Sequence, residues 1–227
     1  MSCWIISKRA RGYGRTTLMA VQNLLNGKTW AESGIPGSYG NGTAMRAAPF
    51  GVYFRHDLNL LKVVVKIDSS ITHLSDEAEA GALAIALASA HAVNNEDNDL
   101  LDKIVPELPN SNLKKTLSGL DALINSSNIN PAQALRVLGT KADVRQTVPA
   151  ALYCYLKFDN YQDAVYAAIK AGGDTDTTAA IVGALFGAKL GMNGINSDLY
   201  SVEDFDKLIE LDSKLFNRNN EKFFPRN

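Results

Sequence analysis

The sequence predicts an all-α fold, a compact single-domain bundle of many short helices. Apolar residues recur at helical spacing along most of the 227 residues, and no alternating run bounded by hairpin turns occurs. The composition is 46% hydrophobic with a formal net charge of −1, as expected for a globular chain that buries a substantial core. We find no linker, low-complexity tract or fixed-period repeat, so the sequence predicts one domain over residues 1–227.

Three helices are expected in the first half of the chain. The first follows Thr16-Thr17, which serve as caps, and ends at Gly27. Its apolar stripe consists of Leu18, Val21, Leu24 and Leu25. A second helix is expected over residues 57–69, although its run Val63-Val64-Val65 also favours a strand. The third begins at Ser75, a capping hydroxyl followed by acids that suit the positive end of the helix dipole, and continues through an Ala-rich stretch.

Apolar periodicity marks further helices in the second half. They are expected near residues 100–105, 113–124, 131–138, 148–156, 161–171, 177–190 and 202–216. Pro131 suits the first position of its helix, because the N–H that proline lacks would have no helical partner there.

Charge and cysteine content argue against several classes of protein. The balance of 23 Lys and Arg against 24 Asp and Glu argues against a nucleic-acid or membrane-surface protein. The longest apolar run, residues 179–188, is too short for the ~20 residues of a spanning helix, and no secretory signal opens the chain. Cys3 and Cys154 are too few for a disulfide framework, which favours a reducing compartment. We therefore expect a cytoplasmic protein without nucleic-acid or membrane partners.

A glycine-rich loop interrupts the helical pattern, with four glycines in the nine residues from Gly34 to Gly42. The backbone N–H groups of such a loop can turn toward a ligand without side chains in the way. A helical stretch follows, and a helix N-terminus favours an anion such as a phosphate. It is not a Walker loop, because no Gly-Lys-Ser/Thr follows. From composition alone, a plain Gly/Ser/Asn turn is the favoured interpretation.

A pair of acids precedes an apolar helix in the run Gly172-Gly173-Asp174-Thr175-Asp176-Thr177-Thr178. One Asp can serve simply as the N-cap of that helix. Two at i and i+2 repel each other, and a hard divalent cation would offset the repulsion, with carboxylates and a Thr hydroxyl as ligands. Mg²⁺ or Ca²⁺ fits better than zinc, because no His or Cys stands near. The residues alone leave the cap and the metal site about equally supported.

Two other polar features are less specific. Lys8, Arg9, Arg11 and Arg15 give four positive charges that either border an anionic ligand or, as we favour, form a solvated face. His73 is expected in a loop between helices, as a ligand contact or a satisfied surface histidine. No spacing among the three His suggests a nucleophilic triad.

Four short motifs follow one another in a specific order. They are Arg11-Gly12-Tyr13-Gly14-Arg15-Thr16-Thr17, Gly37-Ser38-Tyr39-Gly40-Asn41-Gly42 with Met45-Arg46 and Pro49, Thr72-His73, and Gly172-Gly173-Asp174-Thr175-Asp176-Thr177. In this order they resemble the ADP-ribosylglycohydrolase family, which includes dinitrogenase reductase-activating glycohydrolase and the ADP-ribosylarginine and ADP-ribosylserine hydrolases. The resemblance covers about residues 12–191 and implies an all-α fold.

The resemblance also implies an activity and a set of site residues. The activity is magnesium-dependent hydrolysis of the glycosidic bond linking ADP-ribose to a protein side chain or small leaving group. Asp174, Asp176 and Thr177 would be ligands of a two-magnesium centre, with Asp174 and Asp176 also catalytic. The loop residues Gly37, Ser38, Tyr39, Gly40 and Asn41 would hold the diphosphate, chiefly through backbone amides, and His73 would lie in the substrate cleft. The implied partner is ADP-ribose or an ADP-ribosylated protein.

One element of the family has no counterpart here. Members carry a Thr-Asp-Asp element near their start that supplies the other metal ligands, and no Thr-Asp-Asp occurs in this sequence. We expect the 227-residue chain alone to hydrolyse ADP-ribosylated substrate poorly and to self-associate through apolar surface that the segment would cover. The alternative is a non-catalytic ADP-ribose-binding or structural relative, such as the invertebrate lens crystallins that resemble this family.

Overall fold

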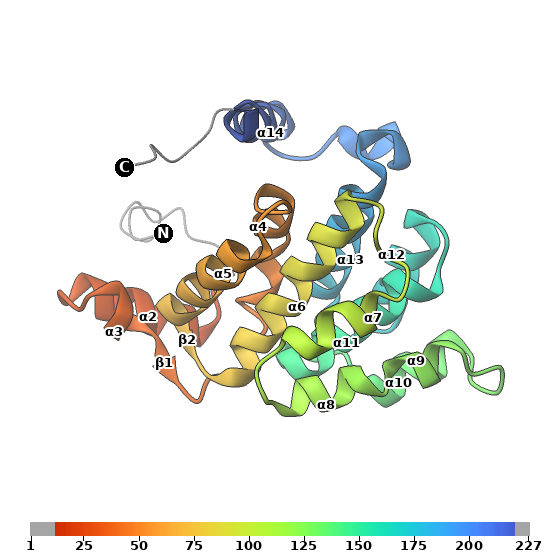
Figure 1. Ribbon diagram of the computed structural model, residues 1–227, viewed down its shortest axis with the longest axis horizontal. Helices are drawn as coiled ribbons and strands as arrows, with labels where there is room; N and C mark the ends of the chain where they lie inside the picture. Colours follow the sequence, from red (N-terminus) through yellow and green to blue (C-terminus); the bar gives the residue numbers. More distant parts are fainter. Residues whose placement is uncertain (1–11, 221–227) are drawn as a thin grey trace.

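The computed structural model of the chain describes the backbone of residues 12–220 and the side chains of residues 12–215 (Figure 1). It confirms the predicted all-α class. Within the described chain, sheet structure is confined to the two-residue strands β1 (Ile35–Pro36) and β2 (His73–Leu74) and one isolated bridge between Gly40 and Asp143. Because β1 and β2 pair in parallel, with Ile35 opposite His73, they bring the glycine-rich loop beside His73.

The remaining elements are helices joined by short connections. The α-helices are α2 (Arg15–Leu25), α3 (Trp30–Ser33), α4 (Ala48–Tyr53), α5 (Leu58–Thr72), α6 (Asp76–Val93), α7 (Leu100–Ile104), α8 (Asn112–Ser118), α9 (Leu120–Ile124), α10 (Pro131–Leu138), α11 (Val144–Lys157), α12 (Tyr161–Lys170), α13 (Thr175–Leu190) and α14 (Phe205–Asn220). The 3₁₀ turns are η1 (Ala44–Arg46), η2 (Val105–Glu107), η3 (Met192–Gly194) and η4 (Ser197–Tyr200).

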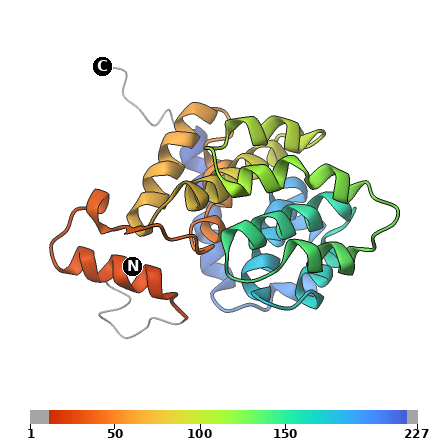
Figure 2. The ribbon, with the colours of Figure 1, turned by 90° about the horizontal axis from the view of Figure 1, so that it is seen from below.

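Helix α6 forms the centre of the molecule and packs against α4, α5, α11 and α13 (Figure 1). The Ser75 hydroxyl accepts a hydrogen bond from the N–H of Ala78 at its start, as the sequence predicts. Nearly every residue from Ala78 to Ala92 is buried, because its small side chains let neighbouring helices approach on all sides. Helices α2 and α3 lie at one edge of the molecule and contact α5 (Figure 2), and the Ser33 hydroxyl of α3 donates to the carbonyl of Ile71 near the end of α5.

The structure corrects several predicted helix ends. Helix α2 is capped at Gly14 rather than at Thr16-Thr17, and Thr17, Ala20 and Val21 face the core. Leu18 and Leu25 of the predicted stripe are exposed, whereas Val21 of the same stripe is buried. The helix predicted over residues 113–124 is interrupted at Gly119, and α13 begins at Thr175 rather than Thr177.

The other predictions for single segments have mixed outcomes. The run at residues 63–65 is helical, within α5, as first expected. His73 lies in a strand rather than in a loop. Cys154 is buried, and burial raises the pKa of its thiol to about 12, whereas Cys3 lies outside the described residues. Within the described chain, no helix combines the length and the apolar character that crossing a membrane requires.

Large apolar side chains are exposed at two edges of the molecule. Leu18, Met19 and Leu25 lie on α2, and Leu208, Ile209, Leu211 and Leu215 lie on α14. The expected self-association through apolar surface stays a prediction.

The close approach of α4 to α6 gives a first testable prediction. A Cβ added at Gly51 would lie 2.0 Å from the carbonyl oxygen of Ala86 in α6. Because backbone cannot move aside easily, we expect Gly51→Ala to lower the free energy of unfolding by about 3 kcal/mol. Gly187→Ala is the matched control, since Gly187 lies inside α13 with no atom within 4 Å of an added Cβ. It should raise stability by about 1 kcal/mol. Urea unfolding curves that shift equally for both variants would contradict this packing.

Candidate functional site

The glycine-rich loop, residues 37–42, is hydrogen-bonded on its first side to the start of α6. The N–H of Gly37 donates to the carbonyl of Leu74, at 2.8 Å. The hydroxyl of Ser75 donates to the carbonyl of Ser38, so the residue that caps α6 also holds the loop. Gly37 has a φ of +67°, a left-handed conformation that favours glycine, and this lets the chain turn here.

On its second side the loop pairs with the segment that precedes α11. The N–H of Val144 donates to the carbonyl of Tyr39, at 3.0 Å, and the N–H of Asn41 donates to the carbonyl of Ala142, at 3.3 Å. These two bonds form the isolated bridge between Gly40 and Asp143. The loop is therefore fixed to two separate parts of the chain, which excludes the plain surface turn that composition alone favours.

The anchoring bonds determine which backbone amides of the loop are already used within the protein. The N–H groups of Gly37 and Asn41 are used within the protein. Those of Ser38, Tyr39 and Gly40 have no hydrogen-bond partner among residues 12–220. Of the backbone amides from 37 to 41 that were expected to bind a diphosphate, only the three consecutive amides of Ser38, Tyr39 and Gly40 thus remain available within the described residues.

His73 lies beneath this loop with only 3% of its surface exposed. Its Nδ1 is 2.8 Å from the hydroxyl of Thr72. A Cβ added at Gly40 would lie 3.2 Å from its Nε2, and one added at Gly42 would lie 3.0 Å from its Cε1. A side chain at either position would therefore crowd the imidazole, which would have to shift by a few tenths of an ångström. The alternative of a surface histidine is wrong, because the ring packs against the inner side of the loop.

Arg46 ties the end of the loop to α5. Its Nη1 donates to the carbonyl of Gly42 at 2.7 Å, and its Nε is 2.7 Å from the carboxylate of Asp68. Its Nη2 donates to Thr72, the same hydroxyl that contacts His73. Burial, and secondarily the charge of Arg46, lower the pKa of His73 to about 4. The histidine is therefore neutral at physiological pH.

The low pKa of His73 predicts a pH-dependent stability. In the unfolded chain His73 titrates near its ordinary pKa of about 6.5. Between that value and about 4 the unfolded chain binds more protons than the folded protein, so the free energy of unfolding decreases as the pH falls through this window. The loss attributable to His73 reaches about 3 kcal/mol at pH 4. Urea unfolding of the wild type and of His73→Gln should give curves that converge at low pH, whereas parallel curves would contradict the burial of a neutral imidazole.

Asn41 joins the loop to the paired acids. Its Nδ2 donates to the carboxylate of Asp174 at 2.5 Å and lies 2.8 Å from the hydroxyl of Thr147 in α11. Asp174 occupies the N-cap of α13, but its side chain makes no capping hydrogen bond. Its N–H donates to the carbonyl of Thr140 at 2.7 Å. The Asp174 carboxylate is thus oriented toward the glycine-rich loop rather than used as a helix cap.

The two carboxylates behave as a coupled pair. Burial, together with the neighbouring Asp176, raises the pKa of Asp174 above its ordinary value. The hydrogen bond from Asp174 lowers the pKa of Asp176. A cation bound beside the two carboxylates would offset their mutual repulsion. Asp176 is exposed, and its carboxylate accepts a hydrogen bond from the N–H of Thr177 at 2.9 Å.

The donor set fits a hard cation in part. Asp174, Asp176 and Thr177 offer carboxylate and hydroxyl oxygens, the ligand types that Mg²⁺ prefers. In the part of the chain that the structure describes, no group of three or more His, Cys, Asp or Glu side chains is arranged to hold a metal ion. The two-magnesium centre, and the role of these three residues as its ligands, therefore stay predictions.

Two cavities flank the loop on either side of Tyr39. One, of about 600 Å³, is lined by the loop, by Arg15 of α2 and by Lys141. The other, of about 860 Å³, is lined by the loop and the starts of α6 and α8. The Tyr39 ring is half exposed and lies 4.3 Å from the guanidinium of Arg145, which holds it between the cavities.

Sequence reasoning missed the segment that precedes α11. Asp143 pairs with Arg145, and hydrogen bonds from that guanidinium lower the pKa of Asp143. The Asp143 carboxylate also accepts from the N–H of Arg145 as the N-cap of α11. An Asp five residues before the predicted helix start at 148 was the available signal for this cap. Lys8, Arg9 and Arg11 lie outside the described residues.

The chain matches known proteins of one family. A model of the ADP-ribosylglycohydrolase family matches residues 2–223. An uncharacterised protein from Archaeoglobus fulgidus is 30% identical over 216 residues, covering 94% of this chain and 69% of that protein. ADP-ribosylhydrolase ARH3 from Danio rerio is 26% identical, with 91% and 66% covered. ADP-ribosylarginine hydrolase Tri1 from Pseudomonas putida is 27% identical, with 84% and 49% covered.

A solved structure shares the fold. It is described as an "ADP-ribosylglycohydrolase-related protein complex" and superposes with a TM-score of 0.70 at 20% sequence identity, covering 96% of this chain and 71% of that chain. The chain spans from 49% to 69% of the length of the three relatives named above.

Proposed function

Because this chain belongs to the ADP-ribosylglycohydrolase family, we propose that it hydrolyses the glycosidic bond between ADP-ribose and a protein side chain or small leaving group. The observation that supports this most strongly is the bridge made by Asn41. This hydrogen bond joins the loop, which has three backbone amides without a partner in the described residues, to the paired acids. One site can thus offer N–H donors for a diphosphate and carboxylates for the reacting ribose.

The loop is the proposed diphosphate site. The amides of Ser38, Tyr39 and Gly40 are consecutive, and such amides bind phosphate oxygens well. Arg15 and Lys141 line the adjoining cavity of about 600 Å³ and add positive charge. His73 supports the loop from below, which makes it a positioning residue rather than a residue that contacts substrate.

The paired acids are the proposed reaction centre. Asp174, Asp176 and Thr177 would hold Mg²⁺, which would supply positive charge for orienting the ribose hydroxyls and lowering the pKa of a water near the anomeric carbon. Asn41 orients the Asp174 carboxylate through its 2.5 Å hydrogen bond, while Thr140 fixes the backbone at the same residue. The protein thus orients the Asp174 carboxylate toward the loop and toward the proposed metal site.

A second candidate is a non-catalytic ADP-ribose-binding or structural protein. It is favoured by the absence of a third acid beside Asp174 and Asp176 within the described residues. Such a protein would bind ADP-ribose through the loop without breaking the glycosidic bond.

The release of free ADP-ribose distinguishes the two candidates. We would incubate the protein with ADP-ribosylated serine peptide, ADP-ribosylated arginine and O-acetyl-ADP-ribose, each with Mg²⁺ or with EDTA. The proposal expects Mg²⁺-dependent release from at least one of them, and the preferred substrate would identify the leaving group. Binding of ADP-ribose without release from any substrate would support the non-catalytic alternative instead.

A further inference from the structure

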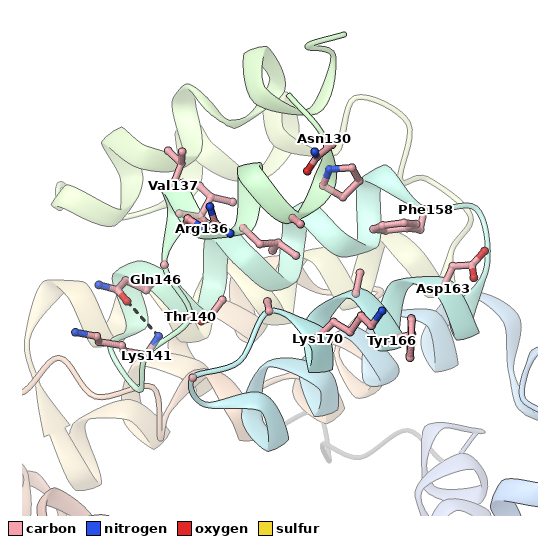
Figure 3. A pocket seen from close by; sticks show the side chains of 18 residues that line it. Asn130, Arg136, Val137, Thr140, Lys141, Gln146, Phe158, Asp163, Tyr166 and Lys170 are labelled. Carbon is pink, nitrogen blue, oxygen red and sulfur yellow. Dashed lines mark hydrogen bonds between the residues drawn. The ribbon is translucent and has the colours of Figure 1, made fainter. Parts of the chain in front are cut away.

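A third cavity lies behind the segment that precedes α11, between α10 and α12 (Figure 3). Its volume of about 1010 Å³ is at the upper end of the usual range for small-molecule sites. Arg136 lies on the α10 wall and Lys170 on the α12 wall, and Lys141 lies at the end nearest the glycine-rich loop (Figure 3). The proposed hydrolysis makes no use of this cavity.

The cavity has an excess of unpaired positive charge. Within the described chain, no ion pair joins Arg136, Lys141 or Lys170 to an acid. Asp163 is the one acid among the lining residues, and its carboxylate accepts a hydrogen bond from Asn160. All four side chains are exposed to solvent, so an anion bound in the cavity would lie beside three cations and a single acid.

Among the described residues, the ammonium group of Lys170 is positioned by an aromatic ring rather than by an ion pair with a carboxylate. Its Nζ lies 4.8 Å from the centre of the Tyr166 ring, in a cation–π contact. Such a contact positions the ammonium group while leaving its N–H donors free for a ligand. The Tyr166 side chain itself is 58% exposed.

The other walls are apolar. Leu135, Leu138 and Phe158 line the cavity, and Val137 is 74% exposed at its edge. A ligand that fits must therefore combine an anionic group with an apolar or ring-bearing body, since either part alone would leave one kind of wall without a partner.

A simpler role exists for two of the three cations. Arg136 and Lys170 lie in the last turns of α10 and α12, where positive charge complements the helix dipole. Lys141 lies outside any helix and lines the same cavity, which the dipole does not explain.

We propose that this cavity binds a small organic anion, a phosphate or carboxylate group on an apolar or aromatic body, at a site separate from the glycine-rich loop. Its inner wall is shared with the candidate reaction centre. Thr140 and Gly173 line the cavity, and the Thr140 carbonyl accepts the hydrogen bond from the N–H of Asp174. Lys141 lines both this cavity and the one of about 600 Å³ beside the loop.

The test titrates three probes by NMR and calorimetry at low salt. Phenyl phosphate carries phosphate on a ring, phenylacetate carries carboxylate on a ring, and inorganic phosphate carries no ring. We expect at least one ring-bearing probe to bind, and inorganic phosphate to bind about tenfold more weakly. The stronger ring-bearing probe identifies the anionic group of the ligand.

Substitutions locate the binding and separate it from the loop. Arg136→Gln and Lys170→Gln keep a polar side chain but remove the charge, and each should raise the Kd of the probe by about tenfold. Lys66→Gln on α5 removes the same charge outside the cavity and should change the Kd less than twofold, and saturating ADP-ribose should not displace the probe. If neither ring-bearing probe bound, the proposal would be overturned, and the only role left for Arg136 and Lys170 would be to complement the helix dipoles. Equal weakening by Lys66→Gln, or full displacement by ADP-ribose, would also overturn it.

Discussion

Replacing Asp174 by asparagine is expected to lower the rate of ADP-ribosyl hydrolysis by about 100-fold or more while leaving the fold intact. The amide has the shape of the carboxylate and can still accept the hydrogen bond from Asn41, but it loses the charge that a cation requires. Stability should change little, because the Asp174 side chain does not cap α13. Single-turnover release of ADP-ribose and a urea unfolding curve on the same preparation measure both quantities.

The matched control is Asp121→Asn, which removes one acid from the first turn of α9, outside the candidate site. It should retain activity within about twofold, since a distant surface charge is screened by salt. If Asp174→Asn also retained wild-type activity, or if both variants lost it equally, the paired acids would not be the reaction centre.

Replacing Gly40 by valine is expected to weaken ADP-ribose binding by about 10- to 100-fold. The physical reason differs from the one that the sequence suggests, which is that a side chain would block the ligand directly. A Cβ at Gly40 points inward and would lie 3.2 Å from Nε2 of His73, so valine displaces the loop from the imidazole. Strain of about 1–3 kcal/mol in the bound loop corresponds to this loss of affinity. Calorimetric titration with ADP-ribose measures it.

Two further variants distinguish a loss of affinity caused by displacement of the loop from one caused by the loss of a single contact. Ser38→Ala removes one hydrogen bond to the Thr16 hydroxyl and should weaken binding by less than about fivefold. Adding His73→Ala to Gly40→Val makes room for the valine and should recover part of the affinity. Absence of any recovery would indicate that the valine acts on the ligand side of the loop.

The helices that the sequence predicts well are those determined by local signals. Helix α10 has the predicted bounds of 131–138, because Asn130 and Pro131 define its start and Gly139 its end. Helix α6 follows from the Ser75 cap and its Ala-rich composition. The exposed face of α2 was predicted incorrectly, because a leucine stripe indicates which side is apolar but not which of its residues other elements cover.

The candidate site depends on contacts between residues far apart in the sequence. The family resemblance implied both the loop and the acids, yet Asn41 and Asp174 are separated by 133 positions and only the fold brings them into contact. The burial of His73 was not predictable either, since it results from the pairing of β1 with β2. The roles of Thr140 and Thr147 likewise come from tertiary contacts and have no signature in the sequence.

The central claim is that the glycine-rich loop and the paired acids form one ADP-ribose site, and calorimetric titration of ADP-ribose with Mg²⁺ or with EDTA tests it most directly. We predict saturable binding of ADP-ribose at one site, and we expect Mg²⁺ to strengthen it. Gly40→Val should weaken this binding with Mg²⁺ and with EDTA. In Asp174→Asn, the affinity for ADP-ribose should no longer depend on Mg²⁺. The absence of binding, or binding that neither variant alters, would contradict the claim.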